Sequence, residues 1–259
     1  MNLSFKKYHG TGNDFIMLDC TENPDFKLTN SQISELCDRR FGIGADGLIM
    51  IFKHPTHHFR MRYHNPDGSQ SFCGNGARCA VHFARQLRLF DNKAIFVAVD
   101  GLHEATFEGE LISLKMNDVQ SINFDKDAYV IDTGSPHYIK FTDKLASQDI
   151  VKIGREIRYS QTYKANGINV NLVEIKDDNS VEMLTYERGV EDETYSCGTG
   201  ATAVALAFSD KSKKDNFEIK IKVKGGNLKV KGKRNPKGFT DIYLIGPAIN
   251  VFSGTIQLL

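Results

Sequence analysis

The sequence predicts an α/β protein built from two copies of one module. Patterns typical of strands and helices alternate along the whole chain. The 259 residues are enough for two domains of medium size. Short glycine-rich motifs of the first half also recur, in the same order, in the second half. Together these observations favour a duplicated α/β architecture over a single continuous domain.

In the first half, two strands flank a Gly-Thr-Gly-Asn turn at residues 10–13. A helix is expected at 29–39, where Thr29 and Gln32 have the spacing of a capping box. A second helix is expected at 76–89, because apolar residues recur there at helical spacing. The strands expected in this half are residues 3–8, 15–19, 47–52, 59–64, 94–99, 104–108 and 111–115.

The second half repeats this mixture of elements. Helices are expected at 149–157 and 201–208, and strands at 169–175 and 181–186. Residues 218–231 alternate between apolar residues and lysines around a Gly-Gly-Asn turn, which predicts a β-hairpin. The alternation alone accounts for the lysines, so we interpret them as a solvated sheet face rather than a phosphate site.

The internal repeat is clearest at a Cys-Gly-x-Gly-Ala motif. Cys73 to Ala77 recurs as Cys197 to Ala201, an offset of 124 residues (from 73 to 197). A Thr-Gly pair recurs at an offset of 122 (from 12 to 134), and a Gly-Ile pair at an offset of 125 (from 42 to 167). Three matches at nearly the same offset indicate duplication of one module, with a boundary in the polar stretch 117–127.

Composition narrows the class of protein. The chain has 33 Lys and Arg against 32 Asp and Glu, and this balance argues against a nucleic-acid-binding protein. No apolar run approaches the length of a membrane span, and the N-terminal residues do not resemble a secretory signal, so we expect a cytoplasmic protein. Five cysteines without a CxxC spacing predict neither a disulfide framework nor a zinc site.

The repeated motif has a chemical interpretation. In each half the cysteine lies just before an apolar helix, where unpaired backbone N–H groups and the helix dipole favour a thiolate. The same N–H groups can hold a carboxylate, and the flanking glycines allow a ligand to approach closely. Two such sites offer two tuned sulfur bases. Inversion of a stereocentre needs such a pair, because one group removes a proton and a second delivers one to the opposite face.

The motifs resemble those of the diaminopimelate epimerase family, a group of pyridoxal-phosphate-independent two-thiol racemases and epimerases. The similar segments cover residues 8 to about 208 in the family's order. They are residues 8–15, 40–47, 65–69, 73–76, 135–137, 167–171, 187–189 and 197–200.

This resemblance implies the roles of individual residues. Cys73 and Cys197 would be the acid/base pair. Residues at the two helix starts would hold the reacting α-carboxylate, namely Gly74, Asn75, Gly198 and Thr199. Others would recognise the far amino-acid end of the substrate, namely Asn13, Asn65, Asn169 and Arg188. Glu187 would lie near the reacting ammonium, and Ser135 and His137 are possible supporting residues.

The resemblance also implies the architecture and the activity. Two pseudo-symmetric domains are expected, each a curved mixed sheet wrapped around a central helix, with the active site in the cleft between them. The domains would be residues 1–117 with 247–259, and residues 118–246. The implied reaction interconverts LL- and meso-2,6-diaminopimelate, in lysine and peptidoglycan-precursor biosynthesis, without a cofactor or metal. A homodimer that binds neither nucleic acid nor membrane is expected.

Two departures from the family pattern leave the substrate open. Ser135 stands where the family often has Asn, and Gly47 stands where some members have Gln. A related racemase of another amino acid, such as histidine, is therefore an alternative. A redox protein using a Cys73–Cys197 disulfide and a non-catalytic amino-acid-binding module are alternatives from other classes. His54, His57 and His58 have no familiar ligand spacing and lie in a Pro-containing loop, so we expect exposed histidines there rather than a metal site.

Overall fold

The computed structural model describes residues 2–258, and the chain divides into two compact units. Unit 1 consists of Met1–Leu114 together with Pro247–Leu259, and unit 2 consists of Lys115–Gly246. The first segment of unit 1 ends close to the boundary expected after residue 117, and the C-terminal segment belongs to unit 1. Unit 2 is therefore continuous in sequence, whereas unit 1 is assembled from both ends of the chain.

Unit 1 contains a mixed sheet and two helices. β1 pairs with β17 on one side and with β2 on the other, both antiparallel. The sheet then continues from β2 through β3, β4, β5 and β6 to β7. The pairs β2–β3 and β4–β5 are parallel, and the pairs β3–β4, β5–β6 and β6–β7 are antiparallel. The strands are β1 (Asn2–Gly10), β2 (Asn13–Asp19), β3 (Gly47–Phe52), β4 (Phe59–His64), β5 (Lys93–Ala98), β6 (Gly101–Glu108), β7 (Leu111–Lys115) and β17 (Ile249–Gln257).

Unit 2 also contains mixed β-structure. Neighbouring strands follow the order β8, β9, β10, β11, β12, β14, β15 and β16. The pairs β10–β11 and β12–β14 are parallel, and the other neighbouring pairs are antiparallel. The short β13 adds to β12. The strands are β8 (Asn123–Asp125), β9 (Ala128–Asp132), β10 (Pro136–Phe141), β11 (Asn169–Asp177), β12 (Ser180–Glu187), β13 (Asp192–Glu193), β14 (Asn216–Val223), β15 (Gly226–Asn235) and β16 (Gly238–Gly246).

The two units share one topology. From β1 to β7, and from β9 to β16 with β13 set aside, the strand orientations follow the same succession. The helices α1 (Asn30–Cys37) and α3 (Ile150–Arg158) connect the second and third strands of this succession. The helices α2 (Gly74–Gln86) and α4 (Gly198–Lys211) connect the fourth and fifth. The sequence repeat is thus a repeat of folded modules.

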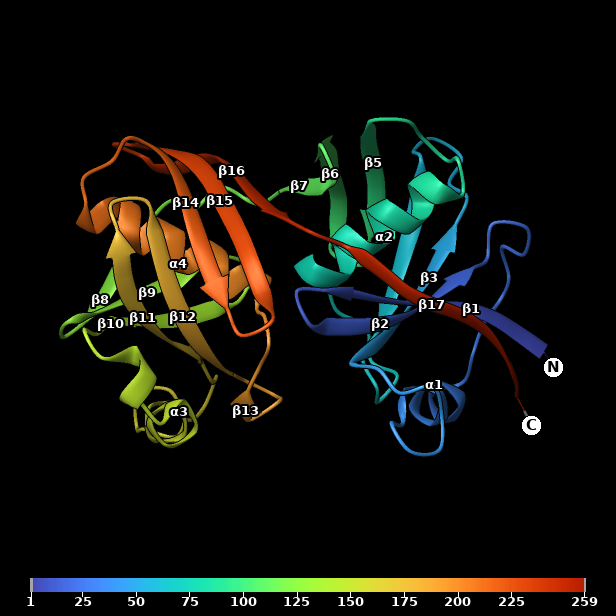
Figure 1. Ribbon diagram of the computed structural model, residues 1–259, viewed down its shortest axis with the longest axis horizontal. Coiled ribbons are helices and arrows are strands. Elements are labelled where there is room, and N and C mark those ends of the chain that lie inside the picture. The colour runs from blue at the N-terminus through green and yellow to red at the C-terminus, as the bar shows by residue number, and fades with distance from the viewer. Residues whose placement is uncertain (1, 259) are drawn as a thin grey trace. The chain divides into compact units, whose positions relative to one another are not determined.

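In each unit one helix is enclosed by the sheet (Figure 1). α2 packs against β1 to β4, and α4 packs against strands from β9 to β16. α4 is apolar on nearly all sides and buried from Gly198 to Ser209 except at Thr199, as expected of a helix in the middle of a core. These central helices carry the Cys-Gly-x-Gly-Ala motifs at their N-termini.

α1 and α3 cover the other faces of the two sheets. Thr29 is the N-cap of α1, and the capping box with Gln32 is present as predicted. Asp149 caps α3 by accepting a hydrogen bond from the backbone N–H of Lys152. Ile33 and Leu36 of α1 pack against the sheet of unit 1, and Ile150 of α3 packs in the core of unit 2. Successive residues of β2 and β3 therefore meet different helices, which explains why both strands are buried almost throughout.

Several strands were not predicted from the sequence. These are β8, β9, β10, β13, β16 and β17. β10 begins with a proline, and β17 is exposed or half-buried along its whole length, so neither has the alternating burial that marks a strand. The two central helices also begin earlier than expected, at Gly74 and Gly198, because glycines of the repeated motif form their first turns.

Candidate active site

The group of residues around Cys73, called the first or Cys73 half-site, lies where the chain enters α2. Cys73 is the N-cap residue of this helix, with an extended backbone conformation and a partly exposed side chain. Gly74 and Asn75 form the first turn, whose backbone N–H groups point out of the helix end. The helix start therefore combines a thiol with a row of N–H donors, as the sequence predicts. This arrangement can hold an anion next to the sulfur.

Asn13 connects the thiol to the rest of unit 1. Its side-chain oxygen accepts hydrogen bonds from the Cys73 thiol, with Sγ at 3.5 Å, and from Asn75 Nδ2 at 3.2 Å. Its own Nδ2 donates to the Asp46 carboxylate over 2.7 Å. Because a carboxylate can only accept here, the Asn13 amide is oriented with its oxygen toward Cys73. Asn13 thus lies directly beside the sulfur.

A network of charged groups supports Asn13 from behind. Lys7 and Arg39 each approach the Asp14 carboxylate to 2.7 Å, and Arg39 also reaches Asp46. Burial raises the pKa of Asp14, but hydrogen bonds from Arg39 and Lys7 outweigh this and hold that pKa at about 2. Asp14 is therefore ionised at neutral pH, and the backbone around Asn13 is fixed by charge-assisted hydrogen bonds.

Asn65 occupies the loop after β4. Its Nδ2 donates to Ser69 Oγ at 3.0 Å and to Ser71 Oγ at 3.2 Å. Its backbone closes the turn that contains Pro66, Asp67 and Gly68. Asn65 therefore helps to form this turn, and the contacts of its side chain are with this loop.

The second half-site repeats the first around α4. Cys197 is the N-cap of this helix, again in an extended conformation, and its side chain is buried. Its sulfur lies 3.4 Å from Thr199 Oγ1. Thr133 Oγ1 donates to the backbone oxygen of Thr199 over 2.8 Å and so links the Thr-Gly turn to the helix start. Gly198 and Thr199 take the places that Gly74 and Asn75 occupy in unit 1.

His137 organises the side chains around Thr199. Its Nε2 lies 2.9 Å from Thr199 Oγ1 and 3.1 Å from Ser135 Oγ, and its Nδ1 lies 3.1 Å from Asn171 Nδ2. Burial, helped by the charge of Arg188, lowers the pKa of His137 to about 3, so the imidazole is neutral at pH 7. With Asn171 donating to Nδ1, the Nε2 proton faces the two hydroxyl groups.

Asn169, Glu187 and Arg188 meet at one end of the sheet of unit 2. Asn169 begins β11 and its side chain donates to Ser135 Oγ at 3.2 Å and to the Pro136 oxygen at 3.0 Å. Its side-chain oxygen accepts from the backbone N–H of Arg188 over 2.9 Å. Arg188 itself follows Glu187, the last residue of β12, and its Nη1 donates to the Asn166 oxygen. The structure therefore brings these three residues and Ser135 into one cluster.

Gly47 and Ser135, the two departures from the family pattern, differ in their surroundings. Ser135 is part of the hydrogen-bond cluster of His137 and Thr199. A Cβ atom at Gly47 would lie 2.3 Å from the Tyr63 ring and 2.8 Å from the His64 oxygen. Only glycine fits at position 47 with Tyr63 in this place.

Sequence reasoning missed several residues that order the two half-sites. Asp46, Thr133 and Asn171 orient Asn13, Thr199 and His137 respectively. Each of the three lies inside or next to a motif that the sequence analysis used. Their positions marked the motif, but only the fold reveals that they contact the site residues.

The remaining cysteines have a packing role. Burial raises the pKa of Cys20 to about 12 and that of Cys37 to about 11, and it raises the pKa of the fully buried Cys79 further. Cys20 and Cys37 belong to the apolar core beside α1. These thiols are protonated at neutral pH and are poor nucleophiles.

Clusters that suggested other kinds of site do not form one. Within residues 2–258, no group of three or more His, Cys, Asp or Glu residues is placed to hold a metal ion.

Ile219, Ile221 and Val223 of β14 are buried while the lysines between them are exposed, as predicted. Lys222 and Lys224 form ion pairs with Glu182 and Glu193, which confirms a solvated, charge-paired sheet face. In the same part of the chain, no helix is long and apolar enough to cross a membrane.

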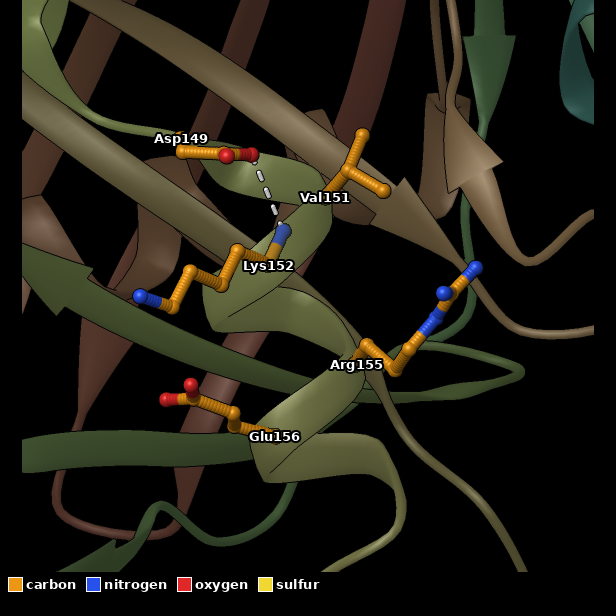
Figure 2. Close-up of a pocket in the computed structure, with 5 residues that line it drawn as sticks. All are labelled: Asp149, Val151, Lys152, Arg155 and Glu156. Atoms are coloured by element: carbon orange, nitrogen blue, oxygen red, sulfur yellow. Dashed lines mark hydrogen bonds between the residues drawn. The ribbon is translucent and has the colours of Figure 1, made fainter.

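An open groove of about 400 Å³ lies along α3 and is lined by Asp149, Val151, Lys152, Arg155 and Glu156 (Figure 2). Figure 2 shows Asp149 engaged with the backbone of Lys152, while the side chain of Arg155 extends away from that of Glu156. None of the predicted site residues lines this groove. Its carboxylate at the helix start has a structural role as a cap.

Comparison with known proteins gives these half-sites a family context. The sequence model of the family described as "Diaminopimelate epimerase" matches residues 5–120 and 129–251. A diaminopimelate epimerase of Flavobacterium psychrophilum is 48% identical over 96% of this chain and 98% of that protein. One of Chlorobaculum tepidum is 39% identical over 96% and 99%.

Solved structures at low sequence identity share the fold. A PhzF-family phenazine biosynthesis protein of Bacillus anthracis has a TM-score of 0.76 at 15% identity, and both chains are covered in full. A hydroxyproline epimerase of Agrobacterium vitis has a TM-score of 0.68 at 11% identity, with 99% of this chain and 93% of that chain covered. These likenesses show the architecture alone. The sequence matches over nearly the whole length go further, and the chain belongs to the diaminopimelate epimerase family of isomerases.

Proposed function

We propose that the protein interconverts LL-2,6-diaminopimelate and meso-2,6-diaminopimelate by inverting one α-carbon. Family membership and the names of relatives at 48% and 39% identity support this substrate. The single observation that carries the proposal is the duplicated helix start. In two units of the same topology, a cysteine caps the N-terminus of the central helix.

In the proposed reaction Cys73 and Cys197 act on the same α-carbon from opposite faces. The thiolate of one cysteine removes the α-proton, and the thiol of the other delivers its proton to the resulting carbanion. No bond to sulfur other than S–H is made or broken, and the two cysteines exchange protonation states in each turnover. The N–H groups at the helix starts hold the α-carboxylate, and their positive dipole stabilises the negative charge that develops beside it.

The other predicted residues fit roles in substrate recognition. We propose that Gly74, Asn75, Gly198 and Thr199 provide the donors for the reacting carboxylate. Asn65, Asn169 and Arg188 would recognise the distal amino-acid group, and Asn13 would contribute from its position beside Cys73. Glu187 would face the reacting ammonium. Ser135 and His137 would support Thr199, consistent with the hydrogen bonds that join these three side chains.

The decisive experiment offers the purified enzyme LL-diaminopimelate, L-histidine and L-proline in separate reactions. Chiral chromatography of the products measures inversion of each substrate. We expect epimerisation of LL-diaminopimelate alone. Turnover of histidine alone would assign the protein to a related racemase. Ser135 and Gly47 motivate this alternative, because both depart from the family pattern. A dithiol-dependent reductase activity, or full function with Cys73 and Cys197 oxidised to a disulfide, would assign it to redox chemistry instead.

We further propose that the enzyme is a homodimer of the cytoplasm. The C-terminal strand β17 exposes Ile249, Val251 and Phe252, which are 46%, 55% and 47% accessible. Apolar side chains gathered on one strand are typical of surfaces that a second copy covers. Sedimentation equilibrium is expected to give twice the mass of the chain, and Val251→Lys is expected to shift the enzyme toward monomer. A wild-type enzyme that stays monomeric at micromolar concentration would contradict the dimer.

A further inference from the structure

Arg78 is a fully buried arginine one turn into the central helix of unit 1. It is 0% exposed, and it is the largest of the fully buried side chains. Among the described residues it has no carboxylate as ion-pair partner, and its Nη1 atom makes no hydrogen bond. Burying a guanidinium without a counter-ion is costly, so a protein has little reason to place one in a core for stability alone.

Two hydrogen bonds of Arg78 lead to the Cys73 half-site, while its Nε donates to the Pro247 oxygen over 3.5 Å. Its Nη2 donates to Asn75 Oδ1 over 3.0 Å and to Thr11 Oγ1 over 3.3 Å. Because a guanidinium can only donate, Asn75 must turn its amide nitrogen the other way, toward Asn13 Oδ1 at 3.2 Å. The same Asn13 oxygen accepts from the Cys73 thiol. A chain of oriented groups therefore runs from Arg78 through two amides to the sulfur.

The surroundings of Cys73 place an acceptor oxygen against the sulfur when the thiol ionises. While Cys73 is protonated, its S–H donates to Asn13 Oδ1. Once the proton has left, the same oxygen faces a negative sulfur, and Asp46 holds the Asn13 amide in that orientation. The charge of Arg78 opposes this repulsion. Burial lowers the pKa of Arg78 to about 10, so the side chain is still a cation at neutral pH, and the charges of Cys79 and, less strongly, Cys73 act in the opposite direction to burial.

The equivalent position in unit 2 is occupied by a neutral residue. The offset of 124 residues (from 73 to 197) places Thr202 at the position equivalent to Arg78. Thr202 is also fully buried, but it is neutral and donates to the Gly198 oxygen over 2.9 Å. His137, the buried titratable group beside Cys197, is neutral at pH 7 as well. The helix start of unit 2 thus forms with a neutral residue at the position where unit 1 has Arg78.

Space for the guanidinium is provided by Gly10 at the end of β1. A Cβ atom there would lie 3.2 Å from Arg78 Nη2 and 3.0 Å from the backbone oxygen of Asn75. A side chain at position 10 would press on both groups. The backbone of the glycine-rich turn and the arginine therefore fit together as one arrangement.

We propose that Arg78 is a positioning residue for Cys73, which orients the Asn75 and Asn13 amides and acts as the resident counter-cation of the Cys73 thiolate. This inference rests on the proposed function, since it assigns a partner to one of the two bases. Its consequence is that ionisation of Cys73 depends on a fixed internal charge at a position where the central helix of unit 2 has the neutral Thr202.

The test compares Arg78→Gln with Arg78→Lys. Gln keeps a hydrogen-bond donor for Asn75 but removes the charge, whereas Lys keeps the charge. Alkylation of ligand-free enzyme by iodoacetamide is followed at Cys73 and Cys197 separately by peptide mass spectrometry between pH 5 and pH 10. In Arg78→Gln we expect the Cys73 profile to move toward alkaline pH, with alkylation about tenfold slower at pH 7, the equivalent of about one pH unit. In Arg78→Lys the profile is expected to stay near that of wild type.

Two controls separate this role from a structural one. Cys197 in the same samples is expected to keep its profile in both variants. Thr202→Val, at the equivalent buried position of unit 2, is expected to leave the Cys73 profile unchanged. A merely structural role would lower the melting temperature without moving the Cys73 profile relative to that of Cys197.

A folded Arg78→Gln enzyme with the wild-type Cys73 profile would overturn the proposal. If Arg78→Gln does not fold, Arg78→Lys decides, because an alkaline shift in a variant that retains the charge contradicts the counter-cation role. Failure of the proposed function is distinguishable from either result, since it shows in the wild-type enzyme as absence of diaminopimelate epimerisation, while the alkylation profiles need no substrate.

Discussion

At the scale of single residues, the proposed reaction gives each of the two cysteines one half of the proton transfer. We expect Cys73→Ser and Cys197→Ser each to lower kcat by a factor of roughly 10³ or more, because a serine hydroxyl is a far weaker acid than a thiol and general acid–base catalysis is worth about 10² to 10⁴. Substrate affinity should change little, since the helix-start donors remain. Calorimetric titration with diaminopimelate measures the affinity, and near-normal turnover by either variant would refute the acid/base assignment.

A second residue-scale prediction concerns His137. Its pKa is about 3 in the folded protein, whereas an unperturbed histidine titrates near 6.5, so only the unfolded state takes up a proton between these values. Folding stability contributed by the neutral imidazole is therefore complete above about pH 6.5 and falls as the pH drops through the window down to about 3. One such group gives a slope of at most about 1.4 kcal/mol per pH unit.

His137→Gln removes this titration. Urea unfolding at pH 7, 6 and 5 is expected to show a smaller acid-induced loss of stability in the variant than in wild type, even though the variant starts from a lower stability at pH 7. Equal slopes in the two proteins would mean that His137 is protonated in the folded state.

At the scale of elements, the two central helices have matched glycines in their first turns. A Cβ atom at Gly200 would lie 2.9 Å from Asn171 Oδ1 and 3.1 Å from His137 Cε1, both parts of the hydrogen-bond cluster beside Cys197. At the equivalent Gly76, the nearest neighbour is Ile49 Cδ1 at 3.0 Å, an apolar methyl group. Gly200→Ala is therefore expected to lower kcat at least tenfold, and Gly76→Ala to have a much smaller effect.

Steady-state kinetics of both variants, with circular dichroism to verify folding, makes this comparison. The two substitutions bring the same gain in helix propensity, about 1 kcal/mol, so a difference between them reports the neighbours of each methyl group. Equal losses of activity would show that crowding of His137 is not the cause.

The sequence predicted some elements of the site and left others hidden, for identifiable physical reasons. The N-cap positions of Cys73 and Cys197 follow from a local pattern of glycines before an apolar helix, and the Thr29 capping box follows from spacing alone. The hydrogen bond between Asn13 and Cys73 joins residues that are far apart in sequence, and the polarity of that bond depends on Asp46. Such contacts are products of the fold. Arg78 directly follows the Cys-Gly-x-Gly-Ala motif, yet nothing in the sequence indicates that it is buried without a counter-ion.

At the scale of the whole molecule, the two units differ in how the chain builds them. Unit 2 is one continuous segment, so residues 115–246 produced alone are expected to fold cooperatively. Unit 1 needs β17, which pairs along the length of β1 and places Phe252 5.9 Å from Phe5, ring centre to ring centre. Residues 1–114 alone are expected to be unfolded or aggregated, because β1 then loses its neighbouring strand.

Heteronuclear NMR spectra of the two fragments test this difference. Adding residues 247–259 to the first fragment through a flexible linker is expected to restore dispersed signals. A well-folded fragment 1–114 would show that β17 contributes little to unit 1.

The pairing of β1 with β17 also bears on how a ribosome delivers this protein. β1 must wait until β17, which follows the whole of unit 2 in the sequence, has left the exit tunnel before its neighbour arrives. The module encoded second can therefore reach its native state while the module encoded first is still incomplete, which reverses the usual order from N-terminus to C-terminus. Emergence of β17 then becomes the event that completes the unit carrying Cys73, and a product terminated before β17 lacks a complete unit 1.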